Sequence, residues 1–214
     1  LFLVGSKRIV KKTILPFDKR VCDFFDELSK RIFYEKNNFE DPDILTFGFW
    51  LRKKNINRLK QNFEDNEFKL PLGLVFHVTP NNVPINFAYS LFFGLITGNT
   101  NIVKVPSKQY LQVEYLCKII NSLLSIKKYK FLKSMINIIR YNNDENITRE
   151  ISKISNARII WGGDRTVQNI KRIPTQIKCV DVTFPDRYSF SIINLDKLEK
   201  LNPDEIKNII KNFY

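Results

Sequence analysis

The sequence predicts an α/β fold in which helices flank a parallel β-sheet, and a helical segment precedes that unit. Strand-like and helix-like segments alternate from Leu72 towards the chain end. The strand-like segments are continuous apolar runs such as Ile159-Ile160-Trp161, which is the composition of strands buried on both faces of a parallel sheet. Residues 73–107 contain one complete unit of strand, Pro/Asn loop, apolar helix and strand. The loops of such units gather at the edge where open sheets bind ligands.

We expect residues 1–70 to form a helical segment that packs on the core. Residues 1–15 have the character of a short strand or an extended arm, and residues 16–34 carry apolar side chains at the helical spacing. A second helix is expected to begin with Asp41 as its N-cap and Pro42 at its first position. The apolar stripe of this helix consists of Leu45, Phe49 and Leu59.

The α/β unit is expected to occupy residues 71–214. The predicted strands are 72–78, 101–105, 136–140, 157–161 and 178–183, followed by an extended piece at 188–193. The predicted helices are 84–97, 108–125, 145–155 and 165–172. Pro84 is expected to open the first of these helices, and Asp164 to cap the last one. A final helix is expected to begin at Asn202-Pro203 and to run to Tyr214.

Length and composition indicate a globular protein of the cytoplasm without a metal site. A chain of 214 residues can bury one substantial core. It has no apolar run of the roughly 18 residues that a membrane span needs, and its apolar start is too short for a signal peptide. Three scattered cysteines without CxxC spacing and a single histidine argue against a disulfide framework and a metal centre.

The chain is strongly basic, with 35 Lys and Arg against 22 Asp and Glu and a net charge of +13. The simplest interpretation is a lysine-rich solvated surface, because the lysines are spread along the chain. Attraction to a polyanion is the functional alternative. Nucleic acid lacks support, since there is no basic helix, zinc pattern or aromatic RNA-binding motif. A phosphorylated cofactor and coenzyme A are polyanions too, and we favour these.

Polar residues follow the first strand of the α/β unit, where a ligand is expected. In the loop 79–84, Asn81 and Asn82 either hydrogen-bond the backbone of their own turn or present neutral donors to a ligand. His77 lies on the strand just before this loop. A single histidine on an apolar strand is commonly a hydrogen-bonded core residue, and the alternative is that it lines a substrate pocket.

Two further loops carry residues suited to anions. Lys104 ends the second strand and is followed by Val-Pro-Ser107-Lys108. Trp161 is followed by a Gly-Gly turn and a helix start. Glycine lets the backbone approach a ligand closely, and the free N–H groups and dipole of a helix N-terminus favour negative charge.

Three motifs of the sequence together resemble those of a known family. They are the run 73–107, the stretch Ala157-Arg-Ile-Ile-Trp-Gly-Gly-Asp164, and the stretch Phe184-Pro-Asp-Arg-Tyr-Ser189. These resemble the dinucleotide-binding half of the aldehyde dehydrogenase superfamily and, within it, the LuxC-type fatty acyl-CoA reductases of bacterial bioluminescence. The resemblance covers about residues 70–214. It implies an aldehyde dehydrogenase-like, Rossmann-type sheet, NADP as cofactor and acyl-CoA as substrate. It also suggests a homo-oligomer and acyl-transferring partner enzymes.

The resemblance assigns roles to individual residues. Asn82 matches the asparagine of the oxyanion hole, where a neutral donor meets the negative charge that develops on the substrate carbonyl. The implied cofactor contacts are Thr79, Pro80, Lys104, Ser107, Lys108, Gly162, Gly163 and Thr166. Asp181 takes the place of the family's glutamate base, with a shorter side chain. Arg187 could pair with Asp186 or with a phosphate, and the stretch 184–189 is otherwise expected to be structural.

The choice of cofactor rests on one departure from the superfamily pattern. Where its members carry an acidic residue that binds the adenosine ribose with the preceding lysine, this chain has Lys108. A carboxylate accepts from a free 2′-hydroxyl and repels a 2′-phosphate, whereas a lysine does the reverse. The resemblance therefore implies NADPH. The alternative is that Lys108 begins a surface helix and points into water.

The nucleophile of the family is a cysteine in a Cys-Ser-Ser-Pro-like segment, and Cys22, Cys117 and Cys179 all lack that context. We expect them to be buried, inert thiols. Since the chain also lacks an initiator methionine, we expect it to be the cofactor-binding portion of a longer product, inactive alone. Two alternatives stay open: an aldehyde or semialdehyde dehydrogenase that works oxidatively, and a non-enzymatic basic binding module.

Overall fold

The computed structural model describes residues 1–214 except 7–8, 35–39, 64–68, 188–191, 193 and 214. Its centre is a six-stranded sheet with the order β1-β4-β3-β2-β5-β6. The strands are β1 (Phe2–Val4), β2 (Leu74–Val78), β3 (Thr100–Lys104), β4 (Ile136–Ile139), β5 (Ala157–Trp161) and β6 (Val180–Phe184). Strands β2 to β6 are parallel, and β1 pairs with β4 in the antiparallel direction at one edge.

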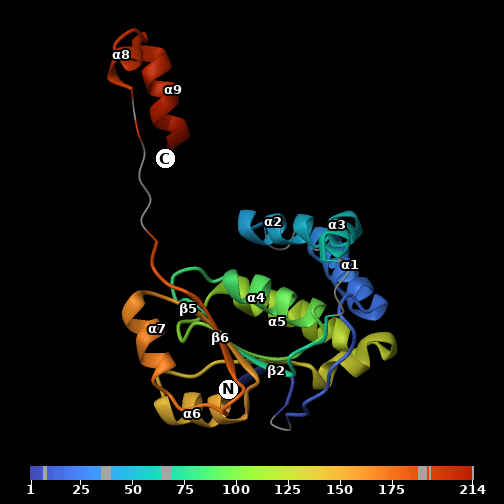
Figure 1. Ribbon diagram of the computed structural model, residues 1–214. Helices are drawn as coiled ribbons and strands as arrows, with labels where there is room; N and C mark the ends of the chain where they lie inside the picture. The colour runs from blue at the N-terminus through green and yellow to red at the C-terminus, as the bar shows by residue number, and fades with distance from the viewer. Residues whose placement is uncertain (7–8, 35–39, 64–68, 188–191, 193, 214) are drawn as a thin grey trace.

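Helices cover both faces of this sheet (Figure 1). Helices α4 (Asn86–Ile96) and α5 (Leu111–Ser125) lie on one face, and α6 (Glu145–Ile154) and α7 (Asp164–Lys171) lie on the other. A 3-10 segment, η2 (Lys127–Ser134), follows α5. The N-terminal helices α1 (Lys19–Tyr34), α2 (Pro42–Trp50) and α3 (Lys53–Phe63) form an outer layer beyond α4 and α5. Helices α8 (Leu195–Leu198) and α9 (Pro203–Phe213) lie away from the sheet.

The core has two parts, one on each face of the sheet. The larger part joins α1, α2, α4 and α5 to side chains of β3 and β4 such as Val103 and Ile138. The smaller part lies beneath α6 and α7 and includes Leu74, Phe76 and Ile151. Because side chains alternate between the faces of a strand, β3 and β4 supply both parts. This arrangement explains the continuous apolar runs of the sequence, and it confirms the predicted α/β class.

Several element boundaries differ from the prediction. The predicted second helix is two helices. α2 ends at Trp50, and α3 begins at Lys53, whose backbone N–H donates to the Asp26 carboxylate at 3.0 Å. Its predicted start is confirmed, since Asp41 caps α2. Pro84 lies in a turn before α4 rather than in its first turn. The expected extended piece at 188–193 lies largely outside the described residues.

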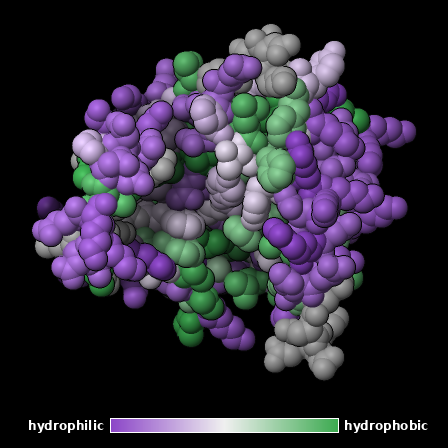
Figure 2. Space-filling view, turned by 90° about the horizontal axis from the view of Figure 1, so that it is seen from above, coloured by the Kyte–Doolittle hydropathy of each residue, from purple (hydrophilic) through white to green (hydrophobic). Residues whose placement is uncertain are grey.

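Figure 2 shows one face of the molecule, on which hydrophilic side chains predominate and apolar side chains form smaller areas. Among the helices of the described residues, none combines the length and the apolar character that crossing a bilayer requires.

Candidate functional site

A pocket of about 890 Å³ lies at the carboxyl edge of the sheet, where the strand order reverses. From β2 the chain proceeds through β3 and β4 in one direction, then returns to the other side of β2 to add β5 and β6. Open α/β sheets bind ligands in the crevice at such a reversal. The pocket is lined by the loops after β2, β4 and β5, by the last residue of β3, and by α6 and α7.

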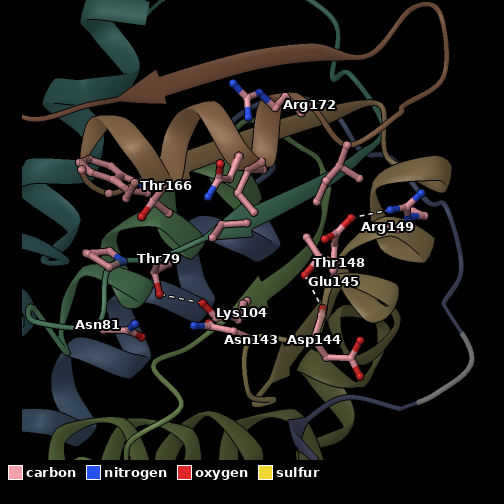
Figure 3. A pocket seen from close by; sticks show the side chains of 18 of the residues that line it. Thr79, Asn81, Lys104, Asn143, Asp144, Glu145, Thr148, Arg149, Thr166 and Arg172 are labelled. Carbon is pink, nitrogen blue, oxygen red and sulfur yellow. Dashed lines mark hydrogen bonds and ion pairs between the residues drawn. The ribbon is translucent and has the colours of Figure 1, made fainter.

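The structure brings most of the predicted site residues together in this pocket. Its lining includes Thr79, Pro80, Asn82, Lys104, Gly162, Gly163 and Thr166. Asn81 lines the pocket as well, and its carbonyl oxygen accepts from Tyr110 Oη at 2.8 Å. Figure 3 shows Thr166 and Arg172 on one side of the pocket and Glu145, Thr148 and Arg149 on the other.

Ser107 and Lys108 do not line the pocket. Both are exposed, and Lys108 Nζ lies 5.5 Å from the centroid of the Tyr110 ring. The chain leaves the pocket after Lys104 because Pro106 is buried and its carbonyl oxygen accepts from Arg140 Nε at 3.1 Å. The structure therefore separates Ser107 and Lys108 from the other predicted cofactor contacts.

Lys104 is the buried cation of the pocket. It is only 9% exposed, and burial lowers the pKa of its ammonium group. Its Nζ lies 5.0 Å from the centroid of the Tyr141 ring, and no carboxylate of the described residues forms an ion pair with it. Thr79 Oγ1 donates to the Lys104 carbonyl oxygen at 2.7 Å and so ties the ends of β2 and β3 together. Because an unpaired buried charge is costly, this position favours an anion from outside the chain.

The Gly-Gly turn leads directly into α7. Gly162 has φ +154°, and a Cβ there would lie 3.1 Å from Thr166 Cγ2. The N-cap of α7 is Gly163 rather than the predicted Asp164, which is the first helical residue. Asp186, which follows β6, caps α7 with its carboxylate, because Asp186 Oδ2 accepts from Asp164 N at 3.2 Å. The two glycines thus let the turn pack closely against Thr166 and the Asp186 carboxylate, next to a helix N-terminus.

The wall formed by α6 was not predicted from the sequence. Asp144 caps α6 by accepting from the backbone N–H groups of Asn146 and Ile147, and Glu145 pairs with Arg149. The pocket is lined by three cations, Lys104, Arg149 and Arg172, and by two carboxylates, those of Asp144 and Glu145. Both carboxylates already interact with groups of α6. An Asp directly before a predicted helix was the one signal in the sequence that could have placed this loop.

His77 is the core residue that the first interpretation expected. It is fully buried, and burial lowers its pKa to about 4. Its Nδ1 lies 2.8 Å from Ser90 Oγ and its Nε2 lies 2.9 Å from Asn101 Oδ1. His77 is not part of the pocket lining.

Asp181 has a structural contact in place of a base role. Its two carboxylate oxygens accept from Nε and Nη2 of Arg158 at 2.8 and 2.7 Å. Arg158 is only 1% exposed, and its Nη1 donates to the carbonyl oxygens of Ile170 and Ile173. Asp181 is the second residue of β6, so it lies below the carboxyl edge and outside the pocket lining. Among the described residues, Arg187 forms no ion pair with Asp186.

The three cysteines are poor nucleophiles in this structure. Burial raises the pKa of Cys22 to about 11 and that of Cys117 to about 12, and it also raises the pKa of Cys179. None of the three lines the pocket. Cys179 precedes β6 rather than lying within a strand. No group of three or more His, Cys, Asp or Glu in the described part of the chain could hold a metal ion.

Comparisons with known proteins bear on the family and the fold of this chain. The model of the acyl-CoA reductase (LuxC) family matches residues 19–210. A comparison with curated proteins finds no match. Solved structures with a similar fold include an NAD-dependent benzaldehyde dehydrogenase from Corynebacterium glutamicum, with a TM-score of 0.62 and 11% identity over 81% of this chain and 42% of that one.

Two other structures show the same likeness. The 1-pyrroline-5-carboxylate dehydrogenase of Thermus thermophilus has a TM-score of 0.61 and 12% identity, over 80% of this chain and 38% of that one. A glyceraldehyde-3-phosphate dehydrogenase from Methanocaldococcus jannaschii, complexed with NADP, has a TM-score of 0.53 and 17% identity, over 82% of this chain and 50% of that one. At these identities the likeness concerns the fold. The chain spans half or less of the length of these three structures.

Proposed function

Because this chain belongs to the acyl-CoA reductase (LuxC) family, we propose that its pocket binds NADPH and that it is the cofactor-binding portion of an enzyme that reduces fatty acyl-CoA to aldehyde. The observation that supports this most is Lys104, a buried cation without a carboxylate partner among the described residues, in a pocket at the reversal of the strand order. Family membership favours an enzyme over a non-enzymatic basic binding module.

The residues of the pocket fit a dinucleotide. The Lys104 ammonium group would attract a phosphate, and the Gly162-Gly163 turn would let a pyrophosphate approach the backbone N–H groups before α7. Thr166 would offer a hydroxyl to the same group. Ile170 and Ile173, at the end of α7, give the pocket an apolar part that a nucleotide base could fill. Bound here, the nicotinamide cofactor would supply the hydride for the reduction.

The reaction we propose converts acyl-CoA, NADPH and a proton into aldehyde, coenzyme A and NADP. Asn82 would act as the oxyanion donor, since it lines the pocket and its amide is neutral. The acyl group would be carried by a cysteine other than Cys22, Cys117 and Cys179, because their raised pKa values and positions outside the pocket make them unsuitable.

The preference for NADPH is proposed from Lys108, which stands where the superfamily carries an acidic residue. Its side chain is exposed and lies outside the pocket lining, so the contact we propose requires the 2′-phosphate to extend out of the pocket. The test is a titration of the chain with NADPH and with NADH, which gives a Kd for each. We expect NADPH to bind more tightly.

Lys108→Glu should weaken NADPH binding by about tenfold or more, the effect of losing one charge-assisted contact, and should bring the two cofactors to similar affinity. Lys118→Glu is the matched control, because Lys118 is also an exposed lysine, on α5, and the same charge change there should leave the ratio of the two Kd values unchanged. A chain that binds neither cofactor would contradict the proposed function. Equal effects of the two variants would contradict the role of Lys108.

A further inference from the structure

A chain of hydrogen bonds runs from the interior of the sheet to the wall of the pocket. Trp161 Nε1 donates to Ser90 Oγ at 3.3 Å, and Ser90 Oγ lies 2.8 Å from His77 Nδ1. His77 Nε2 lies 2.9 Å from Asn101 Oδ1, and Asn101 Nδ2 donates to the Asn99 carbonyl oxygen at 2.7 Å. Strands β2, β3 and β5 and helix α4 all contribute to it.

The direction of each hydrogen bond in this chain follows from its two ends. The indole N–H can only donate, so Ser90 accepts from Trp161 and its own hydroxyl proton is left for His77 Nδ1. At the other end Asn101 uses its amide N–H on Asn99, which leaves Oδ1 as the acceptor for His77 Nε2–H. Both ends therefore require the same neutral tautomer of His77, with the proton on Nε2.

Among the residues linked by these hydrogen bonds, Trp161 is the one that reaches the pocket. It is the last residue of β5 and directly precedes Gly162, and both line the pocket. Its ring stacks on Phe184, with the centroids 3.8 Å apart and the planes 8° from parallel. Stacking fixes the plane of the indole but leaves it free to slide or turn within that plane. The hydrogen bond to Ser90 removes this freedom.

Helix α4 is fitted closely against the middle of the chain of hydrogen bonds. Gly94 lies one turn after Ser90, and a Cβ at Gly94 would lie 2.8 Å from His77 Nε2 and would collide with Asn101 Oδ1. Only glycine allows α4 to approach the strands this closely. Ser90 is therefore held at a fixed position relative to His77, and its hydroxyl gives Trp161 a rigid anchor.

We propose that Ser90 and His77 are positioning residues for the cofactor site: they hold the Trp161 indole in the pocket wall and so fix the start of the Gly162-Gly163 turn. This inference rests on the proposed function, because it assumes that the turn contacts a bound dinucleotide. Neither residue touches the pocket, and both act through Trp161. His77 Nδ1 accepts the Ser90 hydroxyl proton and so fixes the orientation of the hydroxyl group. Without this acceptor, the lone pair of Ser90 Oγ would no longer be held towards the indole N–H.

The test compares Ser90→Ala with Ser29→Ala. Ser29 is the matched control, because it is an equally buried helix serine that donates to the Gly48 carbonyl oxygen at 2.6 Å, outside the pocket. Both variants are made in a Trp50→Phe background, which leaves Trp161 as the single tryptophan. Acrylamide quenching then reports the freedom of Trp161 without any cofactor. We expect faster quenching in Ser90→Ala than in Ser29→Ala.

NADPH affinity is the second readout. Ser90→Ala should raise the Kd about fivefold, the effect of one lost neutral hydrogen bond, whereas Ser29→Ala should leave it unchanged. Trp161→Phe keeps the stacking on Phe184 but has no N–H. In that background Ser90→Ala should therefore have no further effect on the Kd, measured through NADPH fluorescence.

Three results separate the possible failures. Equal quenching in the two serine variants would overturn the positioning of Trp161. A Ser90→Ala effect on the Kd that persists in Trp161→Phe would overturn its action through the indole. If the unaltered chain binds no NADPH, the proposed function fails and the cofactor part of this inference fails with it, although the quenching result still decides whether Ser90 holds Trp161.

Discussion

Acidification should destabilise this protein through a single side chain, His77. Burial lowers the pKa of His77 from 6.5 to about 4, and the chain has no other histidine. As the pH falls below 6.5 the unfolded chain binds a proton on this residue, while the folded protein does not until about pH 4. Unfolding is therefore favoured on acidification. The stability that depends on a neutral His77 is fully present above pH 6.5 and is lost progressively as the pH falls towards 4.

The size of the effect follows from these two pKa values. Proton linkage gives a loss of about 2 kcal/mol in the free energy of unfolding between about pH 7.5 and about pH 5. Carboxylates contribute little in this interval, because most of them titrate below it. The loss has a structural cause as well, since a protonated His77 would present an N–H at Nδ1 to the Ser90 hydroxyl, which would then have to reverse.

Urea unfolding followed by circular dichroism at several pH values measures the effect. His77→Gln is the control, because its neutral amide binds no proton in this range. The variant should be less stable at neutral pH, but its stability should change little between about pH 7.5 and about pH 5. A carbon-edited NMR spectrum of the single imidazole should show the neutral tautomer throughout. An imidazole that titrates near its ordinary pKa, or equal pH slopes for the two proteins, would refute the reasoning.

Three other substitutions test the structure at separate points. Gly94→Ala should lower the free energy of unfolding by about 2 to 3 kcal/mol, measured by urea unfolding, because the new Cβ would collide with Asn101 Oδ1. Asp181→Ala should cost about 3 to 5 kcal/mol, since it leaves the buried Arg158 cation without its carboxylate; a change below 1 kcal/mol would contradict that role. Lys104→Met should weaken NADPH binding by about tenfold or more in a calorimetric titration. Its thermal midpoint should stay the same or rise, because the costly buried charge is removed.

The sequence was sufficient to predict the sheet and its covering helices. Strands β2 to β5 were predictable because they are largely buried under helices on both faces of the sheet, whereas β6 at the edge is partly exposed. The division between α2 and α3 was not predictable in the same way. The apolar spacing continues across Leu51, and the cap that starts α3 comes from Asp26, a residue of another helix. Contacts between distant segments leave no periodic signal.

The sequence predicted which residues meet at one edge of the sheet where the prediction depended on strand ends. Thr79, Lys104 and Gly162 each follow or end a strand of the parallel sheet, so the common direction of the strands brings them to one edge. Ser107 and Lys108 lie outside the pocket lining, and the sequence could not show this because their positions depend on the path of the loop after the strand. That path is set by Arg140, which follows β4 and donates from Nε to the Pro106 carbonyl oxygen.

Position along a strand, rather than residue type, decides what a polar side chain does in this sheet. Arg158 and Asp181 are opposite each other in register near the start of β5 and β6. There Arg158 bonds to the Asp181 carboxylate, to nearby carbonyl groups and to the Ser152 hydroxyl. Three residues further on, Trp161 lies opposite Phe184 at the carboxyl edge.

At that edge the same two strands contribute to the pocket. Trp161 faces the pocket on one side and is held from the other side by Ser90. Asp181, which takes the place of the family's base in the sequence, is therefore structural, whereas Trp161, which ends a predicted apolar strand, lines the pocket. From the positioning role proposed for Ser90 and His77, we expect that the proposed cofactor site is sensitive to mutations as far as Asn101, two strands away from the Gly-Gly turn.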